Sequence, residues 1–509
     1  MAINQIKAGV VLNYVVIGLN ALVGLLYTPY MLRMMGQSEY GLYSLAASVI
    51  AYLTIMDFGF GNAIIRYTAK FRAEGKTEEQ SSLFGMFTLL YAAIGFVAFI
   101  VGGVLCLNVE NLFGDTMSAV ELSRATTILA IMTFNLAISF PMGIYGFIIT
   151  AYEDFVFQKT LNIIRIFLNT AVMVCLLHFG YKAVAMVVVQ TVFNVLTFVA
   201  NWLYCRRKIN IRFSYRGFRW DFMREVAIYS FWIFLNAIMD HLYWSTGQLI
   251  LGVLSGTVAV AVLSVAIQLK NMYYTFSLAI SSVFLPRVTS MVTNGKSDAE
   301  MSEMFIRVGR IQYVVIAYVL SIFTLFGQQF VDIWAGKEYS EVYIITLLFF
   351  VATGIPLIQN LGMTILQARN QMKYRSIMIL CVSVIGIMVS IPMTKLYGIQ
   401  GFCWTIATAV ILGHGILLNI YYHRSIKLDV LSFWKEILKM SMGPIVAVCV
   451  CLMLMQMKTI VIDSIEQLVL WVGAFSLVYI AIFYKFSMND YEQHLVLAPI
   501  NKLRQKLSH

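Results

Sequence analysis

Long runs of apolar residues, separated by short polar segments, follow one another along the whole chain. A helix needs about 20 mostly apolar residues to cross a membrane, because no water in the hydrocarbon core can satisfy its backbone N–H and C=O groups. This rule predicts an all-α polytopic membrane protein with about fourteen transmembrane helices. They are expected near 10–32, 41–61, 83–105, 124–149, 159–179, 183–204, 226–251, 258–282, 308–327, 341–365, 377–395, 400–421, 438–456 and 465–485.

The first apolar run follows Lys7 and exceeds twenty residues, which is longer than the core of a cleavable signal peptide. No small-residue cleavage site follows it, so we expect this segment to remain as the first helix. Basic residues then predict the orientation, because Lys and Arg are enriched in cytoplasmic loops. With the N-terminus inside, the cytoplasmic segments carry 28 of the 36 Lys and Arg residues and the outer segments carry six. Both termini are therefore predicted to be cytoplasmic.

The sequence also repeats itself at a spacing near 220 residues. Six helices in each repeat is an even number, so the second copy enters the membrane in the same direction as the first. The prediction is two parallel six-helix bundles followed by two extra C-terminal helices; shared hydropathy is the alternative explanation of the similarity. The recurring pairs are 19–21 with 235–237, 66–68 with 287–289, 75–79 with 295–298, 180–181 with 397–398, and 204–207 with 421–424.

This organisation divides the chain into five predicted parts. The linker holds seven basic residues interleaved with aromatic ones, a pattern that favours anchoring at the membrane surface, because nucleic-acid binding would require a soluble module. Leucines alternate with basic residues in the tail, which is typical of an amphipathic helix at the membrane interface. The parts are the N-terminal bundle 1–205, the basic cytoplasmic linker 206–225, the C-terminal bundle 226–422, helices 13 and 14 at 423–486, and the cytoplasmic tail 487–509.

Composition excludes the soluble classes. Hydrophobic residues make up 60% of the 509 and charged residues 12%, with a net charge of +11, whereas a soluble chain carries about 25% charged residues. The seven cysteines lie in or beside apolar runs without histidine partners, so we expect neither disulfides nor a metal site. No phosphate-binding, zinc-protease or serine-hydrolase motif is present, and the predicted outer loops are short. We therefore expect no enzyme activity and no cofactor.

Ionisable residues at membrane depth are the first functional candidates, because a charge there usually faces a cavity or a partner. Asp240 and His241 lie about fourteen residues into the seventh predicted helix, and Lys270 about twelve residues into the eighth. At about 1.5 Å per residue, all three can meet near the middle of the bilayer. One interpretation is a cavity-lining pair, Asp240 with Lys270, in which His241 takes part in proton coupling. The other is a static pair that holds the two helices together.

Two further charged residues, Asp57 and Arg165, have two readings each. Asp57 stands in Asp57-Phe58-Gly59-Phe60-Gly61-Asn62 ahead of Arg66, where the glycines permit a close approach or an unwound turn. It is predicted to act in a gate or on a substrate phosphate, or else to form a helix-end salt bridge with Arg66. Arg165 lies about six residues into the fifth predicted helix. Its side chain can extend to the cytoplasmic membrane interface, or its guanidinium can form bidentate hydrogen bonds to a diphosphate.

Several amides stand in the middle of predicted helices: Asn13, Asn20, Gln190 and Asn194. Such groups usually form hydrogen bonds between helices, because an unsatisfied polar group is costly in hydrocarbon. The alternative is that they line a cavity that accommodates sugars.

The opening segments resemble those of the Wzx-like oligosaccharide flippases, a branch of the MOP superfamily that also holds MATE exporters and lipid II flippases. The resemblance rests on 27–30, on 36–43 (Gly-Gln-Ser-Glu-Tyr-Gly-Leu-Tyr), on 57–62 and on Arg66. Topology, repeat and length extend it over the whole chain. It implies a V-shaped pair of bundles in the inner membrane, and coupling to an ion gradient. The cations available for a diphosphate would be Arg165, Lys270 and Arg66.

The resemblance implies a flippase for an isoprenoid diphosphate-linked oligosaccharide, in O-antigen, lipopolysaccharide or other surface polysaccharide assembly. Its expected partners are the lipid-linked oligosaccharide, membrane lipids, and a polysaccharide polymerase with chain-length machinery, but no nucleic acid. A MATE-type exporter of drugs or organic cations is the first alternative, and it would require buried carboxylates, of which Asp240 is the main candidate. A peptidoglycan-precursor flippase is the second alternative. A membrane scaffold or an enzyme is the third.

Overall fold

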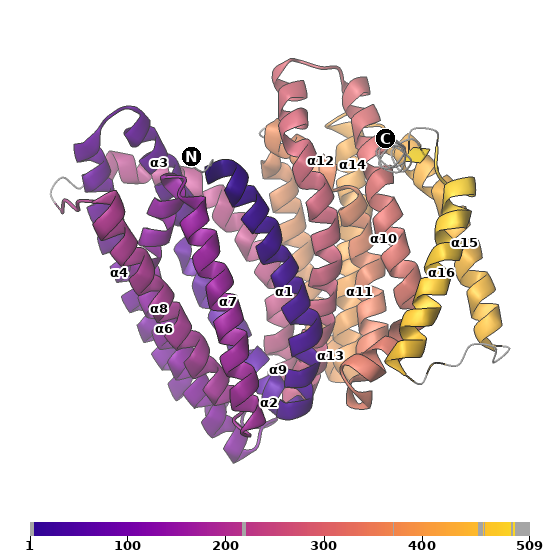
Figure 1. Ribbon diagram of the computed structural model, residues 1–509, viewed down its shortest axis with the longest axis horizontal. Helices are drawn as coiled ribbons and strands as arrows, with labels where there is room; N and C mark the ends of the chain where they lie inside the picture. The colour runs from indigo at the N-terminus through magenta and orange to yellow at the C-terminus, as the bar shows by residue number, and fades with distance from the viewer. Residues whose placement is uncertain are drawn as a thin grey trace, which may run out of the picture. The chain divides into compact units, whose positions relative to one another are not determined.

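The structure is a computed structural model that describes residues 5–215, 220–369, 371–456, 462, 464–489 and 492–493, apart from some side chains within helices. Every regular element in these ranges is helical (Figure 1). The long apolar segments form helices because a helix satisfies every interior backbone group within its own segment. The predicted all-α membrane class is confirmed.

Twelve helical stretches in the described ranges are long and apolar enough to span a membrane. Two of them reverse direction at a glycine with positive φ, Gly256 (φ 80°) and Gly398 (φ 59°). Gln248 Nε2 donates to Ser264 Oγ at 2.8 Å across the first reversal, although sixteen residues of straight helix would separate these residues by about 24 Å. Across the second, a Cβ on Gly386 would lie 2.9 Å from that of Ala409. Two hairpins within twelve stretches give the fourteen crossings that hydropathy predicts.

The chain divides into two compact units, Met1–Ser264 with Thr394–Ile399, and Val265–Met393 with Gln400–His509. This division follows packing, whereas the predicted boundary at 206–225 follows the sequence repeat. The first unit contains α1 (Gln5–Met35), α2 (Gln37–Thr54), α3 (Phe60–Ala73), α4 (Thr77–Leu107), α5 (Val109–Phe113), α6 (Ala119–Ala151), α7 (Phe155–His178), α8 (Ala183–Tyr204) and the start of α9 (Trp220–Thr293). The second contains the rest of α9, α10 (Asp298–Trp334), α11 (Glu341–Ile358), α12 (Asn360–Ala368), most of α13 (Met372–Val410), α14 (Leu418–Arg424), α15 (Val430–Gln456) and α16 (Ile465–Phe486).

Three tight turns recur at the spacing of the sequence repeat. Glycines in the left-handed region stand at Gly36 and Gly256, at Gly75 and Gly295, and at Gly180 and Gly398. The members of the three pairs are 220, 220 and 218 residues apart. Glycine suits such turns because it has no Cβ to clash at positive φ. The same backbone turns at the same repeat positions favour a true internal repeat over a coincidence of hydropathy.

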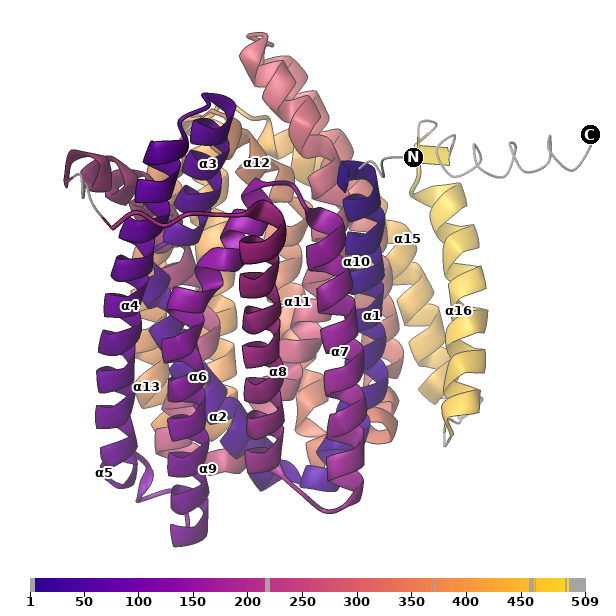
Figure 2. The same cartoon turned by 60° about the vertical axis from the view of Figure 1, so that its left-hand side comes forward.

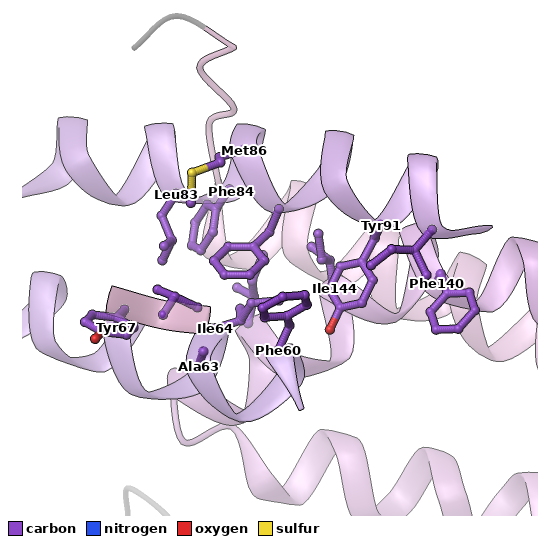
Figure 3. Close-up of a cluster of buried hydrophobic side chains, with 14 of the residues drawn as sticks. Phe60, Ala63, Ile64, Tyr67, Leu83, Phe84, Met86, Tyr91, Phe140 and Ile144 are labelled. Carbon is purple, nitrogen blue, oxygen red and sulfur yellow. The ribbon is translucent and has the colours of Figure 1, made fainter. Parts of the chain in front are cut away.

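In the first unit α1 packs on α7, α7 on α8, α8 on α6, and α6 on both α2 and α4. Figures 1 and 2 both place α1 beside α7 and α6 beside α8. An aromatic core joins α3, α4 and α6, and Figure 3 shows Phe60 and Tyr67 of α3 in the same cluster as Phe84 and Tyr91 of α4. Tyr91 of this core also hydrogen-bonds Asp57.

The turn of α9 at Gly256 and Thr257 also packs closely on α2 and α6. A Cβ on Gly41 would lie 1.8 Å from the carbonyl oxygen of Thr257, so only glycine permits this approach. Glu121 accepts hydrogen bonds from Ser38 at 2.5 Å and from Thr257 at 3.0 Å, and thereby ties three segments together. Arg124 pairs with Glu39 beside them.

The predicted linker 206–225 is shorter than the sequence suggests, because α9 begins at Trp220. Residues 216–219 lie outside the described ranges. Upstream of them, Ser214 N donates to Ser81 O at 3.0 Å, and Phe213 packs against Phe84. The described part of the linker therefore lies against the start of α4. The predicted tail lies almost entirely outside the described ranges, which include only 487–489 and 492–493 of it.

In the second unit the two C-terminal helices pack on α10. Leu325 and Phe326 of α10 share a buried cluster with Met440 and Ala447 of α15 and with side chains of α16. The predicted tenth helix, 341–365, is instead divided into α11 and α12 at Gln359, whose side chain hydrogen-bonds Asn419 at 2.7 Å. The helix ends exposed by such a division need polar partners, and this amide pair stands beside them.

Candidate functional site

Polar residues recur on one face of α7, a largely apolar helix: Gln158, Asn162, Arg165 and Asn169. Their spacing of four, three and four residues places them in one row, because a helix turns once in 3.6 residues. The helix begins at Phe155, four residues before its predicted start. Arg165 therefore lies ten residues, about 15 Å, along it rather than the predicted six residues.

Arg165 and Lys159 both reach across to neighbouring helices and bind amide oxygens. Arg165 Nη1 donates to Asn194 Oδ1 of α8 at 2.9 Å, and Lys159 Nζ donates to Asn13 Oδ1 of α1 at 2.8 Å. The interhelical role predicted for Asn13 and Asn194 is thus confirmed. Neither cation forms an ion pair within the described residues. An amide orients a cation without cancelling its charge, so this part of the unit keeps a positive potential that attracts anions.

The helix α8 has two distinct faces. Val188, Val192, Leu196 and Val199 form an exposed apolar stripe, typical of a surface that meets lipid. Gln190 and Asn194 lie on the other side of the helix, one turn apart. We define the polar seam as Asn162, Arg165 and Asn169 of α7 with Gln190 and Asn194 of α8. Tyr43 of α2 reaches the seam, because its hydroxyl donates to Gln190 Oε1 at 3.1 Å.

A cavity of about 420 Å³ adjoins the seam between α2, α6 and α8, and we call it the neutral pocket. Half of its lining side chains are polar, and none of them is charged. Gln190 belongs to both the seam and the pocket, so the two are continuous. The lining residues are Tyr43, Ala47, Ile50, Ala51, Thr54, Met132, Asn135, Leu136, Ser139, Val187, Gln190 and Thr191.

Asp57 lies at a break between α2 and α3 rather than within one helix. A short 3-10 turn ends at Asp57, and Phe58 (φ 50°) and Gly59 (φ 75°) both adopt left-handed conformations. Tyr91 donates to the Asp57 carboxylate at 2.5 Å, and the N–H groups of Gly59 and Gly61 also hydrogen-bond it. The carboxylate thereby satisfies donors at the start of α3.

The close approach predicted for the Asp57 motif is confirmed at Gly61, where a Cβ would lie 2.4 Å from the ring of Phe147. Arg66 is exposed, and its guanidinium lies 5.7 Å from the ring centre of Tyr67. Its predicted pairing with Asp57, and the gate or phosphate role of Asp57, remain hypotheses.

We expect Asp57→Ala to destabilise the protein by about 1–2 kcal/mol, because the start of α3 loses its acceptor. Asp57→Asn keeps an acceptor oxygen and should cost less than half as much. The thermal midpoint of purified protein in detergent measures both effects, with Asp115→Ala at an exposed aspartate as the control. If Asp57→Asn abolished transport at unchanged stability, the capping role would not suffice and a direct role in transport would be required.

The predicted group Asp240, His241 and Lys270 is placed only in part. His241 Nδ1 lies 3.2 Å from Ser245 Oγ, and its ring centre lies 6.1 Å from that of Tyr52, whose hydroxyl hydrogen-bonds Thr246. The side chain of Asp240 lies outside the described residues. Lys270 is buried, with 6% of its surface exposed, and belongs to the second unit. The pairing of Asp240 with Lys270 therefore stays a prediction.

Sequence reasoning missed several polar residues of this region. Asn162 and Asn169 stand at helical spacing around Arg165, a signal available in the sequence. Lys159 is the first residue of the predicted helix 159–179, and it lies within α7 because that helix begins four residues earlier. Nothing in the sequence singles out Asn135, because its importance depends on which helices face α6.

Comparison with known proteins adds a family model and solved structures. Residues 6–292 match the model of a family described as polysaccharide biosynthesis protein. No curated protein matches the sequence. The lipid II flippase MurJ in an inward closed conformation is similar in structure, with a TM-score of 0.71 and 14% identity over 97% of this chain and 99% of that chain. An inward-facing multidrug resistance MATE family transporter of the MOP superfamily gives 0.61 and 13%, over 81% and 99%.

Proposed function

Because the chain belongs to the polysaccharide biosynthesis protein family and has the fold of MOP-superfamily transporters, we propose that it flips an isoprenoid diphosphate-linked oligosaccharide across the inner membrane. Movement of the headgroup by alternating access would serve the assembly of O-antigen or another surface polysaccharide. The proposal is of a transporter rather than an enzyme.

The observation that carries the proposal is the uncompensated charge of Arg165 and Lys159 within the spanning helices. A diphosphate is an anion, and it gains most from cations that are already oriented and whose charge is not neutralised by a carboxylate. An exporter of organic cations needs the opposite, a carboxylate facing its substrate. The amide partners Asn194 and Asn13 therefore favour an anionic headgroup over a cationic drug.

Orientation and partners belong to the same proposal. Termini on the cytoplasmic side would place the start of α7, where Lys159 lies, toward the compartment in which lipid-linked sugars are made. The expected partners are the lipid-linked oligosaccharide, and a polymerase with its chain-length machinery that consumes the flipped unit. Coupling to an ion gradient would use Asp240, His241 and Lys270 as the titrating or charge-balancing groups.

The direct test is reconstitution of the full chain in vesicles that contain a fluorescent undecaprenyl diphosphate-linked disaccharide. As the protein moves lipid from the inner to the outer leaflet, a membrane-impermeant quencher outside the vesicles should quench it at a rate that rises with protein content. Protein-free vesicles give the background, and Arg207→Ala, an exposed arginine of the linker, is the control variant. The same assay is then repeated with labelled lipid II and with a fluorescent organic cation. Movement of the cation without movement of either lipid would overturn the proposal, and movement of lipid II alone would favour a peptidoglycan-precursor flippase.

A further inference from the structure

The neutral pocket is built to accept hydrogen bonds. The hydroxyls of Thr54, Ser139 and Thr191 each donate to a backbone carbonyl of their own helix, at 2.7, 2.7 and 2.8 Å. Their protons are therefore used, and the oxygen lone pairs are what they offer to a ligand. Asn135 Oδ1 is buried and has no hydrogen-bond partner among the residues that the structure describes. A buried acceptor without a donor is costly, so a ligand that donates to it would gain affinity.

Amide donors complement these acceptors, because Asn135 and Gln190 each carry an NH2 group. The hydroxyl of Tyr43 occupies Gln190 Oε1, which fixes the orientation of the amide. The NH2 group of Gln190 makes no hydrogen bond to another described residue and can donate to a ligand oxygen. The remaining wall consists of small and apolar side chains, among them Ala47, Ala51 and Met132.

This lining selects the chemistry of the occupant. A phosphate group brings only acceptors, so it would face unpaired oxygens and no cation in the pocket. A sugar ring brings several O–H donors, and an acetamido group adds an N–H donor with an apolar methyl. The cavity of about 420 Å³ also falls within the range of about 300–1,000 Å³ that is usual for small-molecule sites.

The pocket stands next to the cation of the polar seam. Gln190 of the pocket and Asn194, which holds Arg165, are four residues apart on α8. Residues at this spacing have Cβ atoms about 5–6 Å apart. A ligand that joins an anionic group to a neutral ring over a short distance matches this layout.

We propose that the neutral pocket is a sugar subsite, which binds one neutral, hydroxyl-bearing ring through Asn135 and Gln190 while the attached diphosphate meets Arg165. This inference rests on the proposed function and adds to it the part of the substrate that is recognised. Neighbouring sugars of the oligosaccharide are not required to enter the pocket.

The test compares two probes on purified full-length protein in detergent, farnesyl diphosphate and farnesyl diphosphate that carries N-acetylglucosamine. The wild type should bind the sugar-bearing probe about tenfold more tightly, the gain expected from one or two added hydrogen bonds. Gln190→Leu and Asn135→Leu should remove this difference and leave the affinity for the sugar-free probe unchanged. Asn20→Leu, at an exposed amide of α1 whose side chain bonds only Val16 O in the described structure, is the matched control and should behave as the wild type.

The outcomes separate the subsite from the function. Equal binding of both probes by the wild type would overturn the subsite and leave the flippase proposal standing. Equal weakening of both probes by Gln190→Leu would also overturn it, because the residue would then act on the diphosphate. Binding of neither probe would overturn the subsite and the proposed function together. Gln190 is exposed at the protein surface, so Gln190→Leu tests the idea even if Asn135→Leu fails to fold.

Discussion

Arg165→Ala is expected to slow lipid translocation by about 10- to 150-fold. A hydrogen bond to a charged group contributes about 1.5–3 kcal/mol, and each 1.36 kcal/mol corresponds to a factor of ten in rate or binding. The guanidinium lies about 15 Å along α7 and is oriented by Asn194. Loss of the cation removes the attraction for the diphosphate, while the apolar packing of α7 on α1 is kept. The measurement is the initial rate of quencher access to the labelled undecaprenyl diphosphate disaccharide in vesicles.

Arg165→Lys separates charge from geometry at the same site. Lysine keeps the charge but has no planar fork, so we expect an intermediate rate if the guanidinium grips a diphosphate. Asn194→Leu leaves Arg165 charged but no longer oriented, and it should slow translocation less than Arg165→Ala does. A wild-type rate for Arg165→Ala, with normal folding, would remove this residue from the transport pathway and would support the alternative of a side chain that merely extends to the interface.

The fold was largely predictable because membrane spans and turns are encoded locally. Each span is a continuous apolar run, and the turns at Gly36, Gly180, Gly256 and Gly398 need only a residue that tolerates positive φ. The break at Asp57 was visible as a polar residue just ahead of two glycines. Its hydrogen bond to Tyr91 was not, because that contact depends on the rotation of α4 against α2.

The candidate site was predictable only in its charged members. Arg165 stands out because a cation in an apolar helix is rare. Its partner Asn194 was one of several amides that the sequence could not rank, and Asn135 did not stand out at all. Helical spacing fixes which residues of one helix share a face, but it does not specify which neighbouring helix that face meets. Lys159 shows the same limit at a helix end, because the predicted helix begins at this residue whereas α7 begins four residues earlier.

A buried ion cluster in the second unit is the feature that sequence reasoning missed most completely. Arg310 of α10 forms a bidentate ion pair with Glu492, in which Nε donates to Oε1 at 2.6 Å and Nη2 donates to Oε2 at 2.8 Å. Its Nη1 donates to Glu436 Oε2 of α15 at 2.7 Å. Only 6% of Arg310 and 4% of Glu492 is exposed. The two residues are 182 positions apart, and Arg310 stands at the start of the predicted helix 308–327. The cluster fastens the C-terminal helices to α10 at a point where the apolar core of the unit ends.

Arg310→Ala is therefore expected to destabilise the protein by about 3–5 kcal/mol, the usual cost of leaving a buried charge without its partner. Glu492→Ala should cost a similar amount, because it removes the two-pronged contact from the same arginine. Denaturant titration of purified protein in detergent measures the free energy of unfolding. Lys439→Ala, which removes an exposed partner of Glu436, is the control and should cost at most about 1 kcal/mol.

The double variant Arg310→Met with Glu492→Leu decides whether burial of a lone charge causes the loss. Removing both charges leaves no unpaired ion, so the pair of substitutions should cost clearly less than the sum of Arg310→Ala and Glu492→Ala. Glu436 keeps its contact with Lys439 in this background, at 2.6 Å. If the double variant were as unstable as that sum, Arg310 and Glu492 would contribute independently, and an unpaired buried charge would not explain the loss. If Arg310→Ala cost no more than Lys439→Ala, the cluster would not hold the C-terminal helices in place.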